Sequence, residues 1–142
     1  MDKGTNPFFG VGYWFVQDNN PETMGAVYAT FIFQLSFATT ATTIVSGAMA
    51  ERTKLRAYIT FSLLNTVIYC IPAHWVWAEN GFLATYGVID IAGSGVVHLL
   101  GGTSSFVAAA MLGPRTGRYD EGTKRLPLGN GTTTLLGRFM LW

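Results

Sequence analysis

The fold of this chain is decided by one stretch, Val88-Ile-Asp90-Ile-Ala-Gly-Ser-Gly-Val-Val-His98-Leu-Leu-Gly-Gly-Thr-Ser-Ser-Phe-Val-Ala-Ala-Ala-Met-Leu112. After Asp90 it carries a single ionisable residue, His98. An apolar run of this length can cross a bilayer as a helix. At about 1.5 Å rise per residue, His98 then lies roughly 15 Å from the start of the run, near the bilayer midplane. Because an ionisable group is costly at that depth, His98 is a candidate functional residue.

The composition of the whole chain also indicates a membrane protein. Its 142 residues are 49% hydrophobic and only 12% charged, with a net charge of +1 at pH 7. Soluble domains carry about 25% charged residues. The small net charge and the lack of basic runs interleaved with aromatics argue against nucleic-acid binding. The one cysteine, Cys70, lies in an apolar run, and we expect it to be buried as a small hydrophobic side chain.

Three apolar segments are long enough to span a membrane, and a fourth begins near the end of the sequence. We predict spans over residues 24–49, 58–76 and 88–112, and the start of a fourth from about residue 132. The runs are too long for the strands of a β-barrel and lack its apolar/polar alternation. The predicted fold class is therefore all-α, a polytopic transmembrane helix bundle. Because the fourth span stops in mid-pattern, we expect the chain to be a piece of a longer protein.

The connecting loops differ sharply in their content of Lys and Arg. The loops after the first and third predicted spans hold seven of the nine basic residues: Arg52, Lys54, Arg56, Arg115, Arg118, Lys124 and Arg125. The loop over residues 77–87 holds none. The positive-inside rule places the two basic loops in the cytoplasm and the loop 77–87 on the other side. The N-terminal segment then also faces outside.

The first predicted span mixes aromatic and hydroxyl side chains. Phe33 and Phe37 are four residues apart and therefore share one helical face. The serine and threonine hydroxyls can bond their own helix backbone or a neighbouring helix. Gln34 needs a polar partner for its amide in lipid. Helix packing is one interpretation of this span, and a pore face with aromatic rings is the other.

The third predicted span contains small residues and an acidic residue near its start. Small residues let helix backbones approach closely, and packing is the simplest explanation of most of them. They are Gly93, Ser94, Gly95, Gly101, Gly102, Ser104 and Ser105. Asp90 stands where the helix is expected to begin, so its carboxylate can accept bonds from free backbone amides. Direct attraction of an ion is the alternative role for Asp90.

Two tryptophans and a histidine end the second predicted span. Trp75 and Trp77 are either interfacial anchors or rings that attract a cation through a π face. His74 is expected to hydrogen-bond the adjoining loop. A metal site is disfavoured because His74 and His98 lie in different spans, and adding Cys70 supplies too few ligands for a closed zinc site. The sequence also has no nucleophile elbow and no phosphate-binding loop.

Five strings in the chain resemble the ammonium transporter family, the group that includes the Rh proteins. They are Phe33-Gln-Leu-Ser-Phe-Ala38, Ile44-Val-Ser-Gly-Ala-Met-Ala-Glu-Arg52, Ala73-His-Trp-Val-Trp77, Val88-Ile-Asp-Ile-Ala-Gly-Ser-Gly-Val-Val-His98 and Gly113-Pro-Arg-Thr-Gly-Arg-Tyr-Asp120. They follow the family's order through almost the whole chain, and the likeness is closest to eukaryotic members of invertebrate type. The resemblance implies about eleven spans per subunit, a homotrimer, and a narrow apolar pore in each subunit. This chain would supply about a third of one subunit.

The resemblance also implies roles for residues at which the motifs match. Trp77 matches the aromatic residue of an outer recruitment site that holds ammonium by cation-π contact, and Phe33 matches an aromatic residue beside it. Phe37 matches a phenyl ring of the outer gate. His98 matches the first of two pore histidines, and Asp90 matches an aspartate that supports the site. The implied function is transport of ammonium or ammonia, with methylammonium as an analogue, across the plasma membrane, with no cofactor and no enzymatic step.

One residue departs from the family pattern, and two other function classes stay open. The family has a small or apolar residue at the position of Arg138. An unpaired arginine costs at least about 2.5 kcal/mol near a helix centre. Arg138 therefore either snorkels from the end of its helix or is a sequencing artefact at the end of a partial sequence. The other function classes are a structural helix-bundle segment and a membrane metal or redox protein using His74 and His98.

Overall fold

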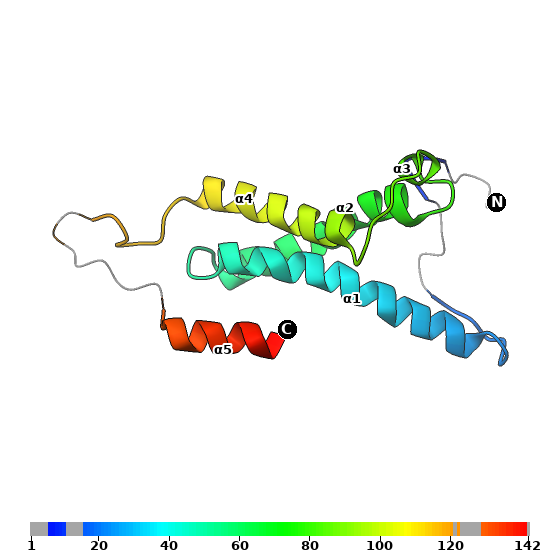
Figure 1. The fold of residues 1–142 in the computed structure, drawn as a ribbon, viewed down its shortest axis with the longest axis horizontal. Coiled ribbons are helices and arrows are strands. Elements are labelled where there is room, and N and C mark those ends of the chain that lie inside the picture. The colour runs from blue at the N-terminus through cyan, green and yellow to red at the C-terminus, as the bar shows by residue number, and fades with distance from the viewer. Residues whose placement is uncertain (1–5, 11–15, 121, 123–128, 142) are drawn as a thin grey trace.

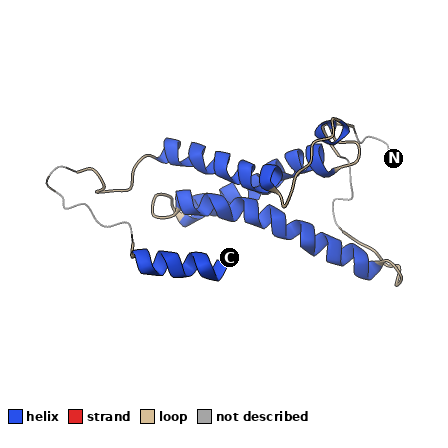
Figure 2. Ribbon diagram, viewed as in Figure 1, coloured by secondary structure: helices blue, strands red, loops and turns tan. Residues whose placement is uncertain are grey.

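The computed structural model describes residues 6–10, 16–120, 122 and 129–141, and these residues form helices joined by loops (Figures 1 and 2). The helices are α1 (Met24–Met49), α2 (Leu55–Trp77), α3 (Phe82–Thr85), the π-helix η1 (Ser94–Leu99), α4 (Leu100–Leu112) and α5 (Gly131–Leu141). Within the described residues there is no strand. Three helical segments are long and apolar enough to cross a membrane: α1, α2 with α3, and η1 continued by α4. The prediction of an all-helical transmembrane bundle is confirmed.

The helices α2 and α5 lie close to the second and fourth predicted spans. α2 begins at Leu55 and ends at Trp77, so it exceeds the predicted range 58–76 at both ends. α5 begins at Gly131, beside the predicted start near residue 132. Arg138 lies in the last turn of α5 with an exposed side chain.

The helix predicted over residues 88–112 begins late, at Ser94. Ala92 and Gly93 have φ angles of 57° and 72°, a left-handed conformation that interrupts a right-handed helix. Apolar composition does not reveal such a turn, which is why the predicted start was wrong. Only four residues of the helix precede His98, a rise of about 6 Å rather than roughly 15 Å.

Small residues let α4 pack closely against the C-terminal part of α1, and Figure 1 shows the two segments side by side. A Cβ atom added at Gly101 would lie 2.9 Å from the Cβ of Ile44. The Ser105 hydroxyl donates a hydrogen bond to the Ile44 carbonyl at 3.3 Å. The packing interpretation of the small residues is confirmed at these two positions. Gly102, in contrast, faces open space.

A buried polar contact joins α1 to α2. Asn65, whose side chain is 1% exposed, donates from Nδ2 to the Thr42 hydroxyl at 2.9 Å. Thr42 in turn donates to the Ala38 carbonyl of its own helix at 3.2 Å. Five other α1 hydroxyls bond backbone carbonyls three or four residues earlier, and they belong to Ser36, Thr39, Thr40, Thr43 and Ser46. Both bonding modes expected for this span therefore occur.

The buried core lies where α1, α2 and η1 meet, and its members are Ala38, Ala41, Tyr69, Val96 and Val97. Cys70 lies outside it and is exposed, which corrects the expectation of a buried thiol. Its Sγ donates to the Thr66 carbonyl at 3.3 Å. Because successive helical residues are about 100° apart, Cys70 points away from the core that holds Tyr69. An apolar run in a membrane protein includes outward-facing side chains as well as core ones, so hydropathy does not locate the thiol.

Candidate functional site

Three of the predicted site residues form a row of rings at the end of the bundle where α2 finishes. The Phe33 and Phe37 ring centroids are 4.8 Å apart with the planes at 85°. The Phe37 and Trp77 centroids are 5.4 Å apart at 61°. Phe37 and Trp77 are half-buried, whereas Phe33 is 59% exposed. The shared face of the two phenylalanines was expected from their spacing, and the structure adds Trp77 from α2 to the row.

Asp90 caps the start of η1. Its Oδ1 accepts the Gly95 amide at 2.8 Å and the Ser94 hydroxyl at 2.9 Å, while Oδ2 accepts the Val96 amide at 3.4 Å. Burial by itself raises the pKa of Asp90, but the hydrogen bonds that stabilise the charged carboxylate outweigh it, so the pKa is lowered. The Trp77 side chain, which lies close to the carboxylate, also lowers this pKa by hydrogen bonding. Asp90 therefore joins the end of α2 to the start of η1.

The left-handed turn before η1 sets the position of His98. The Gly93 carbonyl accepts the amides of Val97 at 2.9 Å and of His98 at 3.0 Å, and the second of these bonds makes the wider π turn. A Cβ atom at Gly93 would lie 2.8 Å from the Val97 side chain, so the turn requires glycine for space as well as for its φ angle.

The His98 ring is exposed on the described part of the chain, with one hydrogen bond that assigns its tautomer. Nδ1 lies 3.2 Å from the Gly93 carbonyl oxygen. Because a carbonyl only accepts, Nδ1 carries the proton, and in the neutral ring Nε2 is left as an acceptor. Among the described residues no ring contact joins His98 to the aromatic row. The row and the histidine are linked instead through Asp90 and η1.

His74 and Trp75 face a different side of the helix end from Trp77. His74 Nε2 donates to the Asn6 carbonyl at 2.9 Å, so its partner lies in the N-terminal segment and not in the adjoining loop, where it was expected. Trp75 Nε1 donates to the Phe8 carbonyl at 2.9 Å. These two bonds between the N-terminal segment and the end of α2 were not predicted from the sequence. The turn-forming sequence that begins at Asn6 is the only local feature that indicates them. With Nε2 engaged, His74 is a poor metal ligand, and the described residues contain no cluster of three ligand side chains.

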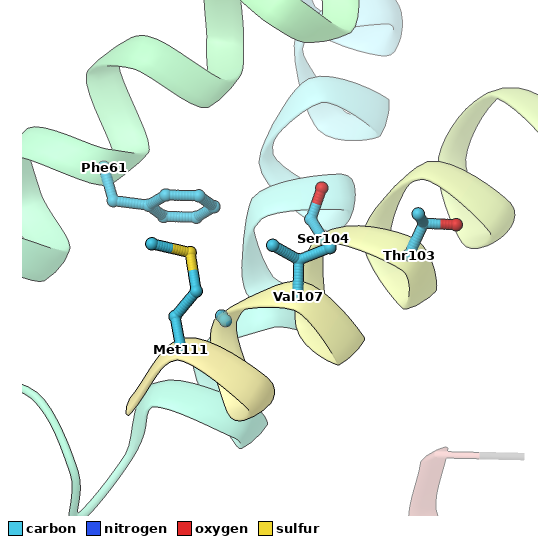
Figure 3. A pocket seen from close by; sticks show the side chains of 6 residues that line it. Phe61, Thr103, Ser104, Val107 and Met111 are labelled. Carbon is cyan, nitrogen blue, oxygen red and sulfur yellow. The ribbon is translucent and has the colours of Figure 1, made fainter. Parts of the chain in front are cut away.

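A hollow lies between α2 and α4, away from the aromatic row. It has a volume of about 300 Å³ and is lined by Phe61, Thr103, Ser104, Val107, Ala108 and Met111. Figure 3 shows the Phe61 ring from α2 beside the thioether end of Met111 from α4. The lining offers two hydroxyl groups and no ionisable side chain, so it is a packing groove rather than a site for acid–base chemistry.

The two basic loops meet at the opposite end of the bundle from the aromatic row (Figure 1). Arg52 Nη1 donates to the Gly113 carbonyl at 3.2 Å. Arg115 Nε lies 2.6 Å from Glu51 Oε2 as an ion pair that lacks hydrogen-bond alignment. Two further basic residues of the second loop, numbers 124 and 125, fall outside the described residues. The described basic residues of both loops therefore gather at one end of the bundle, as the positive-inside assignment requires.

The comparisons with known proteins agree with this architecture. The Ammonium Transporter Family matches the chain over residues 1–142. The chain is 44% identical, over 96% of its length, to a Caenorhabditis elegans protein provisionally named ammonium transporter 3, and covers 21% of that relative. It is 40% identical over 96% of its length to Ammonium transporter 3 of Dictyostelium discoideum, covering 31% of it. It is 37% identical over 98% of its length to Ammonium transporter Amt2 of Archaeoglobus fulgidus, covering 35% of it.

The chain thus spans between about a fifth and about a third of the length of these curated relatives. No solved structure is significantly similar to it. The family match extends over the whole chain, and the three apolar helices are those of a multi-pass membrane protein. The chain belongs to the ammonium transporter family, a family of transport proteins and not of enzymes.

Proposed function

We propose that the complete protein containing this chain transports ammonium or ammonia across the plasma membrane. The observation that carries the proposal is the row of rings that ends at Trp77, together with the Asp90 cap that ties Trp77 to the helix bearing His98. Family membership and the names of the relatives support the same substrate. The rest of the polypeptide would supply the other walls of the pore.

Recruitment of ammonium begins at the aromatic row. The face of an indole attracts a cation, by about 0.5–1 kcal/mol at an exposed site and about 2 kcal/mol once water is excluded. Trp77 is half-buried against Phe37, so part of this desolvation is already in place. Ammonium and potassium have similar sizes, but only ammonium donates hydrogen bonds. Hydrogen-bond acceptors beside the rings would therefore favour ammonium.

Passage beyond the rings favours the neutral molecule. A bare cation in a narrow apolar pore has a high desolvation cost, and transfer of one proton from ammonium to water at the outer mouth, which leaves neutral ammonia, removes most of it. His98 would then offer Nε2 as an acceptor to an N–H group of ammonia, because the Gly93 carbonyl keeps the ring proton on Nδ1. Asp90 acts in this scheme by holding Trp77 and η1, since its oxygens are already engaged by hydrogen bonds.

Assembly as a homotrimer in the bilayer completes the proposal. Phe33 keeps 59% of its surface exposed within this chain, and several outward apolar side chains of α2 are equally open. These surfaces need cover from lipid, from the rest of the polypeptide or from neighbouring subunits. No cofactor is needed for the transport step, because cation binding and the contact with ammonia use the side chains already named.

Uptake of labelled methylammonium by the full-length protein tests the function. Cells that lack their own ammonium uptake should accumulate methylammonium in a saturable way when they express the protein. Ammonium should compete for this uptake, whereas an equal excess of potassium should not. The Trp77→Ala variant should raise the half-saturating concentration by about five- to thirtyfold, which corresponds to about 1–2 kcal/mol of lost cation-π attraction. Expression in the membrane without saturable uptake would contradict the proposal and favour a structural helix bundle.

A further inference from the structure

The N-terminal strap, residues Asn6–Gly10, is a compact turn held by its first residue. The Asn6 side-chain oxygen accepts the amides of Phe8 at 2.9 Å and Phe9 at 2.8 Å. The Asn6 amide donates to the Phe9 carbonyl at 2.9 Å, which closes the turn. Asparagine side chains commonly stabilise turns of this kind by bonding the backbone two residues on.

Three successive carbonyls of the strap all accept hydrogen bonds from α2 or from the start of α3. The bonds run from His74 Nε2 to Asn6 at 2.9 Å, from the Phe82 amide to Pro7 at 3.0 Å, and from Trp75 Nε1 to Phe8 at 2.9 Å. Two of the three donors are side chains that lie three and two residues before Trp77. The strap is therefore hydrogen-bonded to the last turn of α2.

Close packing reinforces these bonds. The Phe82 ring lies 5.2 Å, between centroids, from both Phe8 and Trp75. A Cβ atom at Gly10 would lie 2.9 Å from His74 Nδ1, so the strap approaches the imidazole as closely as glycine allows. The strap and its two donors behave as one packed unit.

The turn of α2 that the strap contacts is less stable than the rest of the helix. Pro72 lies inside the helix and has no amide hydrogen, so one backbone hydrogen bond is missing just before the last turn. Residues 75 and 77 are about 200° apart around the helix, so Trp75 and Trp77 point to nearly opposite sides. The strap thus holds one side of the turn, while Phe37 and Asp90 contact Trp77 on the other.

We propose that the N-terminal strap, through His74 and Trp75, positions Trp77 for cation recruitment. The proposal rests on the transport function proposed above. Without the strap, the turn after Pro72 would tilt more freely, and the Trp77 indole would spend less time against Phe37 and Asp90. His74 and Trp75 are positioning residues in this scheme, since they act through the helix turn and do not contact the transported cation.

Methylammonium uptake by strap variants of the full-length protein tests the proposal. His74→Ala and Trp75→Phe each remove one strap bond, and the second keeps an aromatic ring against Phe82. Loss of one such bond should raise the half-saturating concentration about two- to tenfold. The maximal rate and the amount of assembled protein in the membrane should stay near wild type. Competition by potassium should become stronger, because the selective site is less well formed.

Two matched variants separate positioning from general stability. His74→Gln keeps an N–H donor near the place of Nε2, so it should restore most of the wild-type half-saturating concentration. Asn6→Ala opens the strap turn and should behave as His74→Ala does. Asn20→Ala breaks a similar turn before α1, in which the Asn20 side chain accepts the Glu22 amide at 3.1 Å, and should leave uptake unchanged.

The outcomes divide cleanly between the two proposals. Absence of saturable uptake by the wild-type protein would overturn the transport function and the strap proposal with it. Wild-type uptake with unaltered half-saturation in both His74→Ala and Trp75→Phe would overturn the strap proposal alone. So would equal losses of assembled protein in His74→Ala, His74→Gln and Asn20→Ala. If His74→Ala fails to assemble, the milder Trp75→Phe variant decides the question by the same measurement.

Discussion

Asp90 is the residue at which the contacts of the candidate site converge. It lies before η1, and its carboxylate accepts bonds from the first turn of that helix and from the Trp77 side chain of α2. A negative charge at a helix N-terminus is favourable, by about 0.3–1 kcal/mol for an exposed group. One short side chain therefore contacts both the Trp77 indole and the helix that carries His98.

Replacing Asp90 by asparagine should change both stability and its dependence on pH. Because the hydrogen bonds lower the pKa of Asp90 below its ordinary 3.8, the carboxylate contributes stability above the ordinary pKa. That contribution is lost as the pH falls through the lowered pKa. Asp90→Asn should cost about 0.3–1 kcal/mol at neutral pH, and less in acid. Thermal unfolding of the purified full-length protein across this pH range measures the difference; a constant difference would show that the charge plays no part.

His98→Ala should alter transport while leaving assembly intact. The His98 side chain is exposed within this chain and takes no part in the buried core, so its removal leaves no cavity there. We expect the full-length variant to transport ammonium more slowly or to discriminate less against potassium. Transport in vesicles, with the amount of assembled protein measured in parallel, distinguishes this from a structural role. Wild-type rate and selectivity would remove His98 from the site.

At the scale of elements, the contact between α1 and α4 holds the bundle together. The contact depends on a backbone approach at Gly101 and on the Ser105 hydroxyl, both directed at Ile44. α4 continues η1 without a break, so the same contact also fixes the direction in which η1 leaves the Asp90 cap. The packing of α1 against α4 therefore also affects the position of η1 relative to Asp90.

Two neighbouring glycines in α4 offer a matched test of this contact. Gly101→Ala places a methyl group 2.9 Å from Ile44 Cβ, and such overpacking typically costs about 1–3 kcal/mol. Gly102→Ala meets no atom within 4 Å and should be neutral, or stabilising by up to about 1 kcal/mol through helix propensity. Thermal unfolding of the two full-length variants gives the comparison. Equal destabilisation of both would place the close contact elsewhere.

At the scale of the whole molecule, the two ends of the bundle differ in chemistry. One end carries the aromatic row and the strap, and the other carries the paired basic loops. The positive-inside rule then predicts that Asn80 is outside and Lys54 is inside. Because Cys70 is exposed, labelling needs a Cys70→Ala background. An impermeant thiol reagent applied outside should label Asn80→Cys and not Lys54→Cys, while permeabilised cells should show both; the reverse pattern would invert the topology.

The described helices bury little of their own apolar surface. At most 22% of the most apolar part of any of the three long helices is buried within the chain. The groove in Figure 3 is one of the surfaces that the described residues leave open. We therefore expect the isolated 142-residue chain to show no saturable ammonium transport in vesicles, because its helices are left largely uncovered and it spans only about a fifth to a third of the length of its relatives. Transport by the isolated chain would show that these helices alone form a pore.

The sequence by itself determined the class of the protein and much of its layout. Long apolar runs predict transmembrane helices. Lipid offers no hydrogen bonds to the backbone, so a spanning segment must pair its own amide and carbonyl groups. The clustering of Arg and Lys in two loops assigns the ends of the bundle, and the spacing of Phe33 and Phe37 gives one face of α1. The motif strings were enough to point to the family that the comparisons then established. All of these properties are local or additive along the chain.

Only the tertiary structure decided how distant residues meet. The late start of η1 depends on the left-handed angles at Ala92 and Gly93, which leave no trace in hydropathy. The exposure of Cys70 depends on which side of α2 faces the core. The strap bonds join residues 67 and 68 positions apart, so no local periodicity records them. Helical period and composition describe each segment alone, whereas these features arise from the free energy of packing one segment against another.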